Sequence, residues 1–443
     1  MLNSGKIKRI ILFLGDIISF YIAFILGLFL RYGFSFRWDR IVLNLWPFTI
    51  YLFLILLFYL INRLYETEFS RNHWRLYKNI GESLIIVFII AVLTIYLTDI
   101  PFTPRRNLIV ITSCFAVIDI LWRIVFSFVI AKKHPQKLAI LGHSSSVDEF
   151  DNYTQKNPQF GYIVVSTYNE WGNEAKEAIF GQIQNKRINC IAIKNLGEQP
   201  NIYSDLAHYL NDKVRLVDWI SVYAEVFKRV PLEDIDNIWI ARVVGVNETN
   251  QAITFKRVFD ICLASIGLVI CLPIWFLAAI LIKLTSKGPI FYLSERVGQF
   301  GKPFKIVKLR TMVSNAKDIG PSYTVVNDSR ITFVGRILRK THLDETPQFI
   351  NILKGEVSFV GPRPEEIKLA REYEKNIPYY STRYLIKPGV TGWAQINYPQ
   401  STTLAEAKTK LEYDFYYLKS GNPVLDLIII LKTIRVALEM NTN

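Results

Sequence analysis

The sequence is poor in the residue types from which disulfide frameworks and transition-metal sites are built. It has four cysteines and five histidines among 443 residues. The cysteines form no CxxC pair, and the histidines do not follow the spacing of metal ligands. A disulfide framework and a zinc site are therefore not expected, and the histidines are predicted to be ordinary surface or interfacial residues.

A complete dinucleotide-binding motif is also missing. In nucleotide-binding α/β units the pattern G-x-G-x-x-G follows the first strand. Here the strand-like run at 137–141 is followed by Gly142-His143-Ser144-Ser145-Ser146, which holds one of the three glycines. This favours a structural or regulatory role for the region over cofactor binding.

Acidic residues are in the minority: 38 Asp and Glu stand against 52 Lys and Arg, for a net charge of +14. Hydrophobic residues make up 51% of the chain, and the mean hydropathy of +0.22 is too high for an ordinary soluble enzyme. The basic excess suits anionic lipid headgroups and phosphorylated ligands. Most aromatic residues fall inside apolar runs rather than between polar ones, so a lipid bilayer is the expected partner and nucleic acid is not.

Four apolar runs occupy the first third of the chain, at 10–30, 47–61, 80–97 and 108–130. Each is close to the roughly 20 residues that a helix needs to cross a bilayer. Ten Lys and Arg residues flank the runs on one side and five on the other, which predicts both ends of the four-helix unit in the cytoplasm. No cleavable signal peptide is expected. Asp119 and Arg123, spaced i, i+4, are predicted to form a structural pair.

After residue 135, strand-like runs alternate with helix-length polar segments, which predicts a small parallel sheet. The runs lie at 137–141, 162–166, 189–194, 214–217 and 238–244. We therefore expect a membrane protein of three parts: a bundle of four transmembrane helices at 1–133, a Rossmann-like α/β domain at 134–250, and a mostly α-helical domain at 251–443.

A fifth apolar run follows Lys256-Arg257 and, apart from Asp260, carries no charge until Lys283. Crossing the membrane here would place the rest of the chain outside the cell, although both flanks are basic. A re-entrant hairpin at about 256–284, broken at Pro273, avoids this, because proline removes a backbone donor and bends a helix. A plain spanning helix remains the alternative. The last apolar run, begun by Asn422-Pro423, is predicted to be an interfacial helix beside the hairpin.

The chemistry is concentrated around an acidic pair, Asp344-Glu345, which lies between Arg336, Arg339 and Lys340 on one side and Gly361-Pro362-Arg363-Pro364 on the other. Arginine suits phosphate oxygens, one carboxylate suits Mg²⁺, and a second carboxylate is free to act as nucleophile or base. Thr346-Pro347 predicts a helix start, with Gly355 at its end. The alternative is therefore that the pair only complements a helix dipole.

Short motifs follow one another over about 185 residues, from Lys256 to the end of the chain. They are Lys256-Arg257-x-x-Asp260, Gly288-Pro289-Ile290-Phe291, Arg296-Val297-Gly298-x-x-Gly301, Phe304-Lys305-x-x-Lys308-Leu309-Arg310-Thr311-Met312, Asp328-Ser329-Arg330-Ile331-Thr332-x-x-Gly335, Leu343-Asp344-Glu345-x-Pro347-Gln348, Gly361-Pro362-Arg363-Pro364, Lys387-Pro388-Gly389-Val390-Thr391-Gly392-Trp393-Ala394-Gln395 and Tyr413-Asp414. With these motifs in this order, the chain resembles the bacterial polyprenyl-phosphate hexose-1-phosphate transferases, which are membrane-inserted phosphoglycosyl transferases.

The resemblance implies a two-step reaction at the cytoplasmic face of a bacterial inner membrane. Asp344 would attack the β-phosphate of a UDP-sugar and release UMP, and undecaprenyl phosphate would then take the sugar-1-phosphate. Glu345 would bind Mg²⁺. The remaining implied roles are phosphate contacts by Lys308, Arg310 and Arg363, with Arg339 a weaker candidate, polar pocket positions at Gln395 and Asp414, and anchoring of the hairpin by Lys256, Arg257 and Asp260.

Three positions depart from the family pattern: Leu272 stands where serine often precedes the hairpin proline, Glu295 replaces a common glutamine, and His342 replaces a common serine. Two alternatives remain: a non-catalytic scaffold that binds polyprenyl phosphate, and a membrane nucleotide-sugar dehydratase, which would need the missing glycine motif. A homodimer and an association with downstream glycosyltransferases stay open.

Overall fold

The computed structural model describes the chain with gaps, and every structural statement below concerns the described residues alone. They are 4–33, 38–62, 64–65, 73–97, 105–130, 135–194, 202–207, 214–247, 250–316, 319, 328–398 and 403–440.

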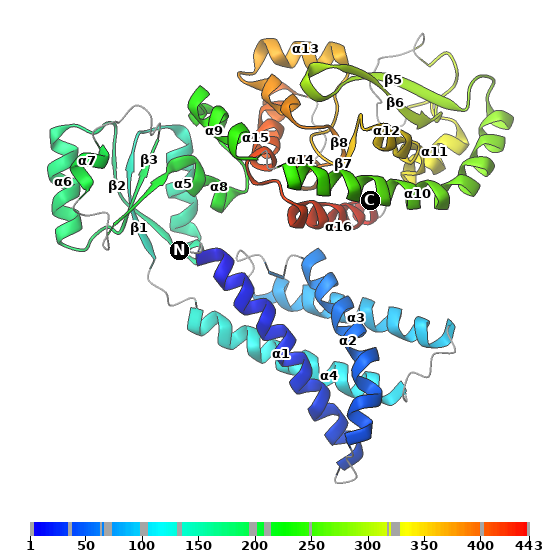
Figure 1. The fold of residues 1–443 in the computed structure, drawn as a ribbon, viewed down its shortest axis with the longest axis horizontal. Helices are drawn as coiled ribbons and strands as arrows, with labels where there is room; N and C mark the ends of the chain where they lie inside the picture. The colour runs from blue at the N-terminus through cyan, green and yellow to red at the C-terminus, as the bar shows by residue number, and fades with distance from the viewer. Residues whose placement is uncertain are drawn as a thin grey trace. The chain divides into compact units, whose positions relative to one another are not determined.

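The N-terminal part consists of four long apolar helices, as the sequence predicts (Figure 1). They are α1 (Ser4–Tyr32), α2 (Trp38–Ile61), α3 (His73–Leu97) and α4 (Arg105–Ile130). Each contains a segment long and apolar enough to cross a membrane. The second helix begins at Trp38 rather than at 47 and holds Pro47 inside it.

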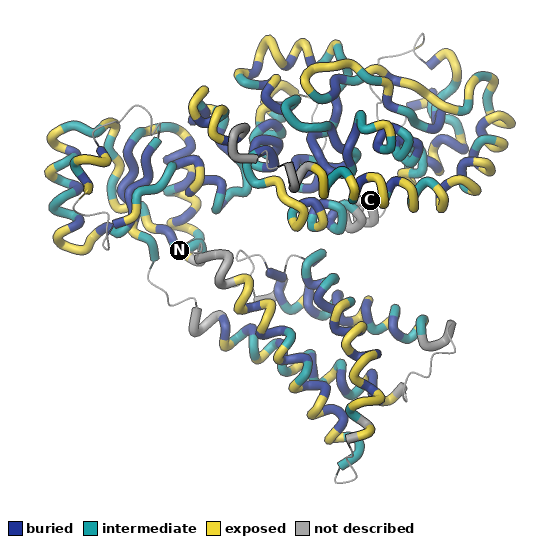
Figure 2. Tube along the Cα trace, viewed as in Figure 1, coloured by how far each residue is buried: buried dark blue, intermediate teal, exposed yellow. Residues whose placement is uncertain are grey.

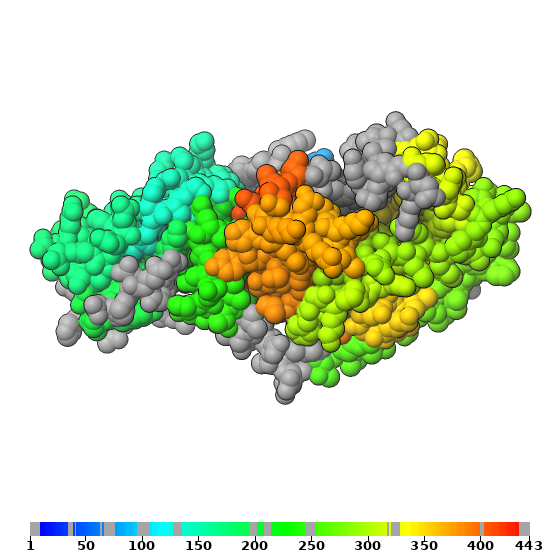
Figure 3. Space-filling view, turned by 90° about the horizontal axis from the view of Figure 1, so that it is seen from above, coloured from blue at the N-terminus to red at the C-terminus, as the bar shows by residue number. Residues whose placement is uncertain are grey.

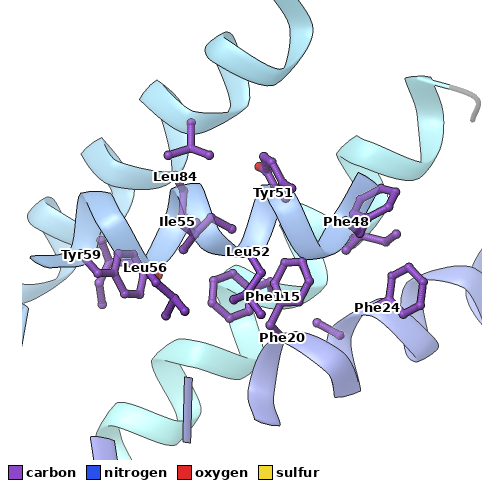
Figure 4. Close-up of a cluster of buried hydrophobic side chains, with 14 of the residues drawn as sticks. Phe20, Phe24, Phe48, Tyr51, Leu52, Ile55, Leu56, Tyr59, Leu84 and Phe115 are labelled. Atoms are coloured by element: carbon purple, nitrogen blue, oxygen red, sulfur yellow. The ribbon is translucent and has the colours of Figure 1, made fainter. Parts of the chain in front are cut away.

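The helices enclose an aromatic core (Figure 4). Phe20 from α1 and Phe115 from α4 pack edge to face with ring centroids 5.3 Å apart, and Ile55 from α2 is fully buried beside them. Large apolar side chains such as Ile18 and Phe53 point outward and are more than half exposed. A bundle that is apolar both inside and outside is typical of a protein surrounded by lipid.

The middle region is an α/β unit with a four-stranded sheet in the order β2-β1-β3-β4. Its strands are β1 (Gln136–Leu141), β2 (Tyr162–Tyr168), β3 (Cys190–Ile193) and β4 (Arg215–Asp218), and its helices are α5 (Ser145–Lys156), α6 (Asn173–Gln184) and α7 (Ile202–Leu206). Because β1 pairs in parallel with both β2 and β3, the predicted parallel sheet is confirmed. The order is the flavodoxin-like one, whereas the Rossmann order places β1 between β2 and β4.

The strand predicted at 238–244 is wrong, because this segment forms helix α9 (Asn237–Asn247). Trp239 and Val243, one helical turn apart, are buried on one face of α9, and the Asp236 carboxylate accepts a hydrogen bond from the Trp239 backbone N–H at 2.6 Å. The run Ile-Trp-Ile-Ala-Arg-Val-Val is rich in β-formers, but packing at helical spacing overrides that local preference.

The compact C-terminal unit includes α9 and the preceding helix α8 (Trp219–Phe227). Both contribute buried side chains to a cluster with Phe415 and Tyr380. The compact C-terminal unit therefore includes helices that precede residue 251, which is the predicted start of the third domain.

Helix α10 (Asn250–Thr285) is a single helix of 36 residues that contains Pro273. The helix is not interrupted at this proline, in contrast to the predicted break, although the ribbon turns in its second half (Figure 1). One missing backbone donor allows a kink without ending a helix. Much of α10 is exposed (Figure 2), including Val269 and Phe276.

The rest of the C-terminal unit surrounds two small sheets. Antiparallel β5 (Phe291–Val297) and β6 (Pro303–Leu309) form one, and parallel β7 (Ser358–Val360) and β8 (Gly389–Thr391) form the other. The helices are α11 (Phe333–Lys340), α12 (Gln348–Lys354), α13 (Ile367–Asn376), α14 (Trp393–Asn397), α15 (Leu404–Ser420) and α16 (Pro423–Met440). In the space-filling view the orange atoms around α13 lie beside the yellow-green β5 and β6 (Figure 3), where Arg296 and Glu366 pair at 3.1 Å.

Candidate active site

A short turn between two helices presents the acidic pair. The 3₁₀ turn Leu343–Glu345 follows α11 and precedes α12, and His342 enters it in the left-handed conformation with φ of 54°. Gly355 ends α12 in the left-handed conformation, as predicted. The predicted N-cap role of Thr346 is wrong: its hydroxyl donates to the Leu343 carbonyl at 2.7 Å instead, because Thr346 already has helical backbone angles.

Glu345 is held by two cations. Its Oε1 accepts hydrogen bonds from Lys308 Nζ at 2.6 Å and from Arg363 Nη2 at 3.2 Å. Burial alone would raise the pKa of Glu345, but Arg363 and Lys308 outweigh it and lower the pKa to about 2. Glu345 is therefore ionised at neutral pH, and its carboxylate holds Lys308 and Arg363 beside the acidic pair.

Asp344 has a different environment. No described residue donates a hydrogen bond to its carboxylate, and burial together with the adjacent Glu345 raises its pKa despite Lys308, Arg339 and His342. Arg339 is oriented by a 2.8 Å hydrogen bond from its Nε to Thr311 Oγ1. A carboxylate of raised pKa without hydrogen-bond donors is more nucleophilic than one held by ion pairs, so the two acids are suited to different roles.

The Gly361-Pro362-Arg363-Pro364 motif positions Arg363 through the β7–β8 sheet. Gly361 N–H donates to Thr391 O, and Gly389 N–H donates to Pro362 O, both at 2.9 Å. A Cβ at residue 361 would collide with the Lys387 carbonyl. The glycine therefore permits the close backbone approach that directs Arg363 to Glu345.

Three of the residues expected to contact substrate make their hydrogen bonds elsewhere. Arg310 donates to the carbonyls of Ser286 and Lys287 at 2.8 and 2.9 Å, and Gln395 Nε2 donates to Val390 O at 3.1 Å. The structure thus brings Lys308, Arg339 and Arg363 to the acidic pair but gives Arg310 and Gln395 contacts with the backbone.

Asp414 is the third of these residues. It is buried and pairs with Arg383 Nη2 at 2.7 Å, and the same nitrogen donates to the Arg363 carbonyl at 3.1 Å. Asp414 therefore supports the backbone of Arg363 through Arg383.

Lys256, Arg257 and Asp260 tie the first half of α10 to the rest of the unit. Lys256 Nζ pairs with Asp426 Oδ2 at 2.6 Å, which places α16 beside α10 as predicted. Arg257 donates to the carbonyls at the end of α12 at 2.6 and 2.7 Å, and Asp260 accepts from the Phe359 N–H at 3.1 Å. Pro273 lies further along α10, between the buried side chains of Cys271 and Trp275.

Trp275 and Thr311 contact the site but could not be identified from the sequence. Trp275, in the second half of α10, donates from its indole Nε1 to Thr346 Oγ1 at 2.8 Å. Trp275 lies within an apolar run whose side chains are expected to face lipid. Thr311 belongs to the motif that contains Lys308 and Arg310, but only these two basic residues were assigned a role there.

The acidic pair fits the expected Mg²⁺. Hydrogen bonds from described residues engage Oε1 of Glu345, which leaves its Oε2 and the Asp344 carboxylate as hard oxygen donors. Mg²⁺ typically takes one or two carboxylates, with water and substrate phosphates completing its shell.

Comparison with known proteins agrees with this geometry. The sequence profile described as "Bacterial sugar transferase" matches residues 251–440. The "Exopolysaccharide production protein PSS" of Rhizobium leguminosarum bv. phaseoli is 38% identical over 188 residues, which cover 41% of this chain and 94% of that protein. This chain belongs to the bacterial sugar transferase family.

Longer members of the bacterial sugar transferase family are matched in part. The "UDP-N-acetylgalactosamine-undecaprenyl-phosphate N-acetylgalactosaminephosphotransferase" of Aeromonas hydrophila is 40% identical over 183 residues, covering 41% of this chain and 43% of that protein. The "UDP-glucose:undecaprenyl-phosphate glucose-1-phosphate transferase" of Escherichia coli (strain K12) is 30% identical over 294 residues, covering 63% of each. The chain thus spans less than two thirds of the length of these two relatives.

Proposed function

We propose that this protein transfers a sugar-1-phosphate from a UDP-sugar to undecaprenyl phosphate, the initiating step of surface polysaccharide or glycan assembly. The observation that carries the proposal is the Asp344-Glu345 turn, with Lys308 and Arg363 bound to Glu345 at 2.6 and 3.2 Å. The names of the relatives support both substrates. They include N-acetylgalactosamine and glucose donors, so the sugar is a question for experiment.

In the first step an Asp344 carboxylate oxygen attacks the β-phosphorus of the UDP-sugar. The bond from that phosphorus to the bridging oxygen breaks, and UMP leaves with the oxygen. In the second step the phosphate of undecaprenyl phosphate attacks the same phosphorus and releases the Asp344 carboxylate. Lys308, Arg339 and Arg363 provide the positive charge that stabilises the phosphoryl group during both displacements.

Glu345 is our proposed holder of Mg²⁺, which leaves Asp344 as the nucleophile. When bound there, the ion neutralises charge on the diphosphate. Glu345 is suited to this because its low pKa keeps it ionised, and because Lys308 and Arg363 fix its Oε1. Replacement by Gln is expected to abolish the Mg²⁺ dependence of activity together with most of the activity.

The catalytic unit is proposed to lie at the cytoplasmic face of a bacterial inner membrane, with α10 entering and leaving from that side. Both ends of α10 bind the same folded unit: Lys256 pairs with Asp426, and Arg310 holds the carbonyls of Ser286 and Lys287. A straight helix of 36 residues would be about 54 Å long, enough to carry its far end across the roughly 30 Å hydrocarbon core. Because both ends of α10 contact the same folded unit, they are expected on the same side of the membrane, which supports a re-entrant path.

The topology is tested with a single cysteine at position 287 in a variant whose four native cysteines are replaced. Labelling from the cytoplasmic side alone is expected. Labelling from outside would mean that α10 spans the membrane.

The activity is tested by UMP release from a panel of UDP-sugars, with purified protein, Mg²⁺ and undecaprenyl phosphate. We expect release with one donor class and a loss of about a thousandfold, or roughly 4 kcal/mol, in Asp344→Asn. A non-catalytic scaffold would release no UMP with any donor, and turnover by Asp344→Asn would assign the nucleophile to another residue.

A further inference from the structure

A buried charge cluster lies inside the four-helix bundle, far in sequence from the acidic pair of the active site. It consists of Asp16 on α1 and Asp119 and Arg123 on α4, all within segments long and apolar enough to cross a membrane. Both aspartates have no exposed surface, and the Arg123 side chain is 3% exposed. Charged side chains at such a depth are costly unless their charges balance.

One guanidinium lies between the two carboxylates. Arg123 Nη2 is 2.7 Å from Asp16 Oδ2, and its Nε is 3.7 Å from Asp119 Oδ1. Arg123 Nη1 donates to the Leu64 carbonyl at 2.8 Å. The predicted pair of Asp119 with Arg123 is therefore present, but Asp16 makes the shorter contact with the arginine.

The charges of the cluster do not balance. Two ionised carboxylates and one guanidinium leave one negative charge in excess. Among the residues that the structure describes, the groups around the cluster supply no further cation. Tyr59 from α2 donates its hydroxyl to Asp119 at 2.9 Å, Tyr65 lies with its ring against Arg123 and its hydroxyl near Asp16, and on α3 Lys78 is exposed and 3.7 Å from Glu82. Within this described part of the bundle, the excess negative charge calls for a compensating group inside the cluster.

The hydrogen bonds indicate where the missing positive charge belongs. Asp16 Oδ1 and Asp119 Oδ1 are buried, no described residue donates a hydrogen bond to either oxygen, and both carboxyl groups contact the same guanidinium, that of Arg123. A proton on one of the two carboxyl groups neutralises the cluster. Two carboxyl groups that share a site favour this singly protonated state.

We propose that Asp16 and Asp119 bind one proton between them inside the membrane bundle. The site is independent of the proposed catalytic reaction, and its ligand is a proton rather than a metal ion. A single Asp→Asn change at either position leaves one carboxylate opposite one guanidinium. That arrangement is neutral without any proton, so either change should release the bound proton completely.

The test is infrared spectroscopy of the full chain in lipid vesicles, which detects the carbonyl stretch of a protonated carboxylic acid. All variants carry Asp344→Asn and Asp414→Asn, because burial also raises the pKa of these two carboxyl groups and they would otherwise contribute to the band. We expect the band in this parent, no band from the site with Asp16→Asn or Asp119→Asn, and an unchanged band with Asp39→Asn, which alters an exposed residue of α2.

Two further measurements keep the proposal testable if an aspartate variant misfolds. Arg123→Gln removes the cation that contacts both carboxyl groups, so the band area should double. In the parent protein, the band should be the same in sodium, potassium and choline buffers. A band equal in the parent and both aspartate variants, no band in the parent, or a band that disappears when sodium is added would overturn the proposal, the last by identifying a metal cation as the ligand.

Discussion

The indole of Trp275, in the second half of α10, donates a hydrogen bond to the hydroxyl of Thr346, the residue that follows the acidic pair, over 2.8 Å. The same hydroxyl donates to the Leu343 carbonyl at 2.7 Å, which closes the turn that presents Asp344 and Glu345. Trp275 lies in the helix proposed to enter the membrane, so the catalytic turn is linked directly to that helix. The position of the turn that carries Asp344 and Glu345 then depends on correct insertion of α10 into the membrane.

The first prediction concerns this link. Thr346→Val removes the hydroxyl with little change of shape, and Trp275→Phe removes the indole donor. A neutral hydrogen bond contributes about 1 kcal/mol, so we expect each change to lower kcat for UMP release about fivefold, and the double variant to lose little more than either single one. Thr341→Val, which alters an exposed threonine bonded to its own helix, is the control. Additive losses would show that the two side chains act separately.

The second prediction is a shift in the pH dependence of the first step. The Asp344 nucleophile must be ionised, so the rate should rise with pH through its pKa, which lies above the ordinary value of 3.8. Lys308 lowers that pKa by attraction, and its removal disfavours the carboxylate further. Lys308→Met should therefore move the acid limb of single-turnover UMP release to higher pH. Lys305→Met, at an exposed position of the same strand, should leave the limb in place.

The third prediction concerns Arg363, whose guanidinium binds Glu345 and whose carbonyl is held by Arg383. Lysine keeps the charge but cannot reproduce the planar fork of donors. We expect Arg363→Lys to reduce kcat/KM by about thirtyfold, equivalent to about 2 kcal/mol for a hydrogen bond to a charged group. Arg371→Lys, on the exposed face of α13, is the matched control. Near-normal turnover of Arg363→Lys would remove this side chain from the site.

The sequence was sufficient for features that depend on local pattern. The length of the apolar runs located α1 to α4, and the alternation of strand-like and helix-length segments located β1 to β4. The resemblance to a known family assigned Lys308 and Arg363 to the phosphates of the substrate, and the structure places both beside Glu345. The sequence failed at 238–244, where β-branched residues favour a strand but tertiary packing selects a helix. It also failed at Thr346, which already has helical backbone angles and whose hydroxyl donates to the Leu343 carbonyl instead of capping α12.

Contacts between residues that are far apart in the chain were the main feature that the sequence did not predict. Asp119 and Arg123 are neighbours on one helix and could be paired from spacing alone, whereas Asp16 is 107 residues from Arg123 in the chain. Arg310 and Asp414 belong to motifs rich in functional residues, yet their contacts are with backbone and with a buried arginine. A motif identifies which residues a family keeps, but not whether each one touches substrate or supports a neighbour that does.

The segment 218–247 precedes the family match at 251 and is nevertheless packed into the C-terminal unit. Trp239 lies 6.0 Å from the Phe415 ring of α15, and Arg229 pairs with Glu412 of the same helix at 2.8 Å. Trp393 donates from its indole to the Lys228 carbonyl at 2.8 Å. The folding unit that carries the site therefore includes α8 and α9.

The fourth prediction follows from this packing. Trp239→Ala empties a buried indole site and should lower the free energy of unfolding of the C-terminal unit by about 3 kcal/mol or more. Ile238→Ala, at a neighbouring position that is 46% exposed, should change it by less than about 0.5 kcal/mol. Denaturant unfolding of the full chain in detergent, followed by loss of UMP release, measures both. Because Trp239 is far in sequence from Asp344, a loss of activity that tracks unfolding would show that α9 supports the site by stabilising its unit. Equal stability of the two variants would instead mean that the family match at 251 marks the true start of that unit.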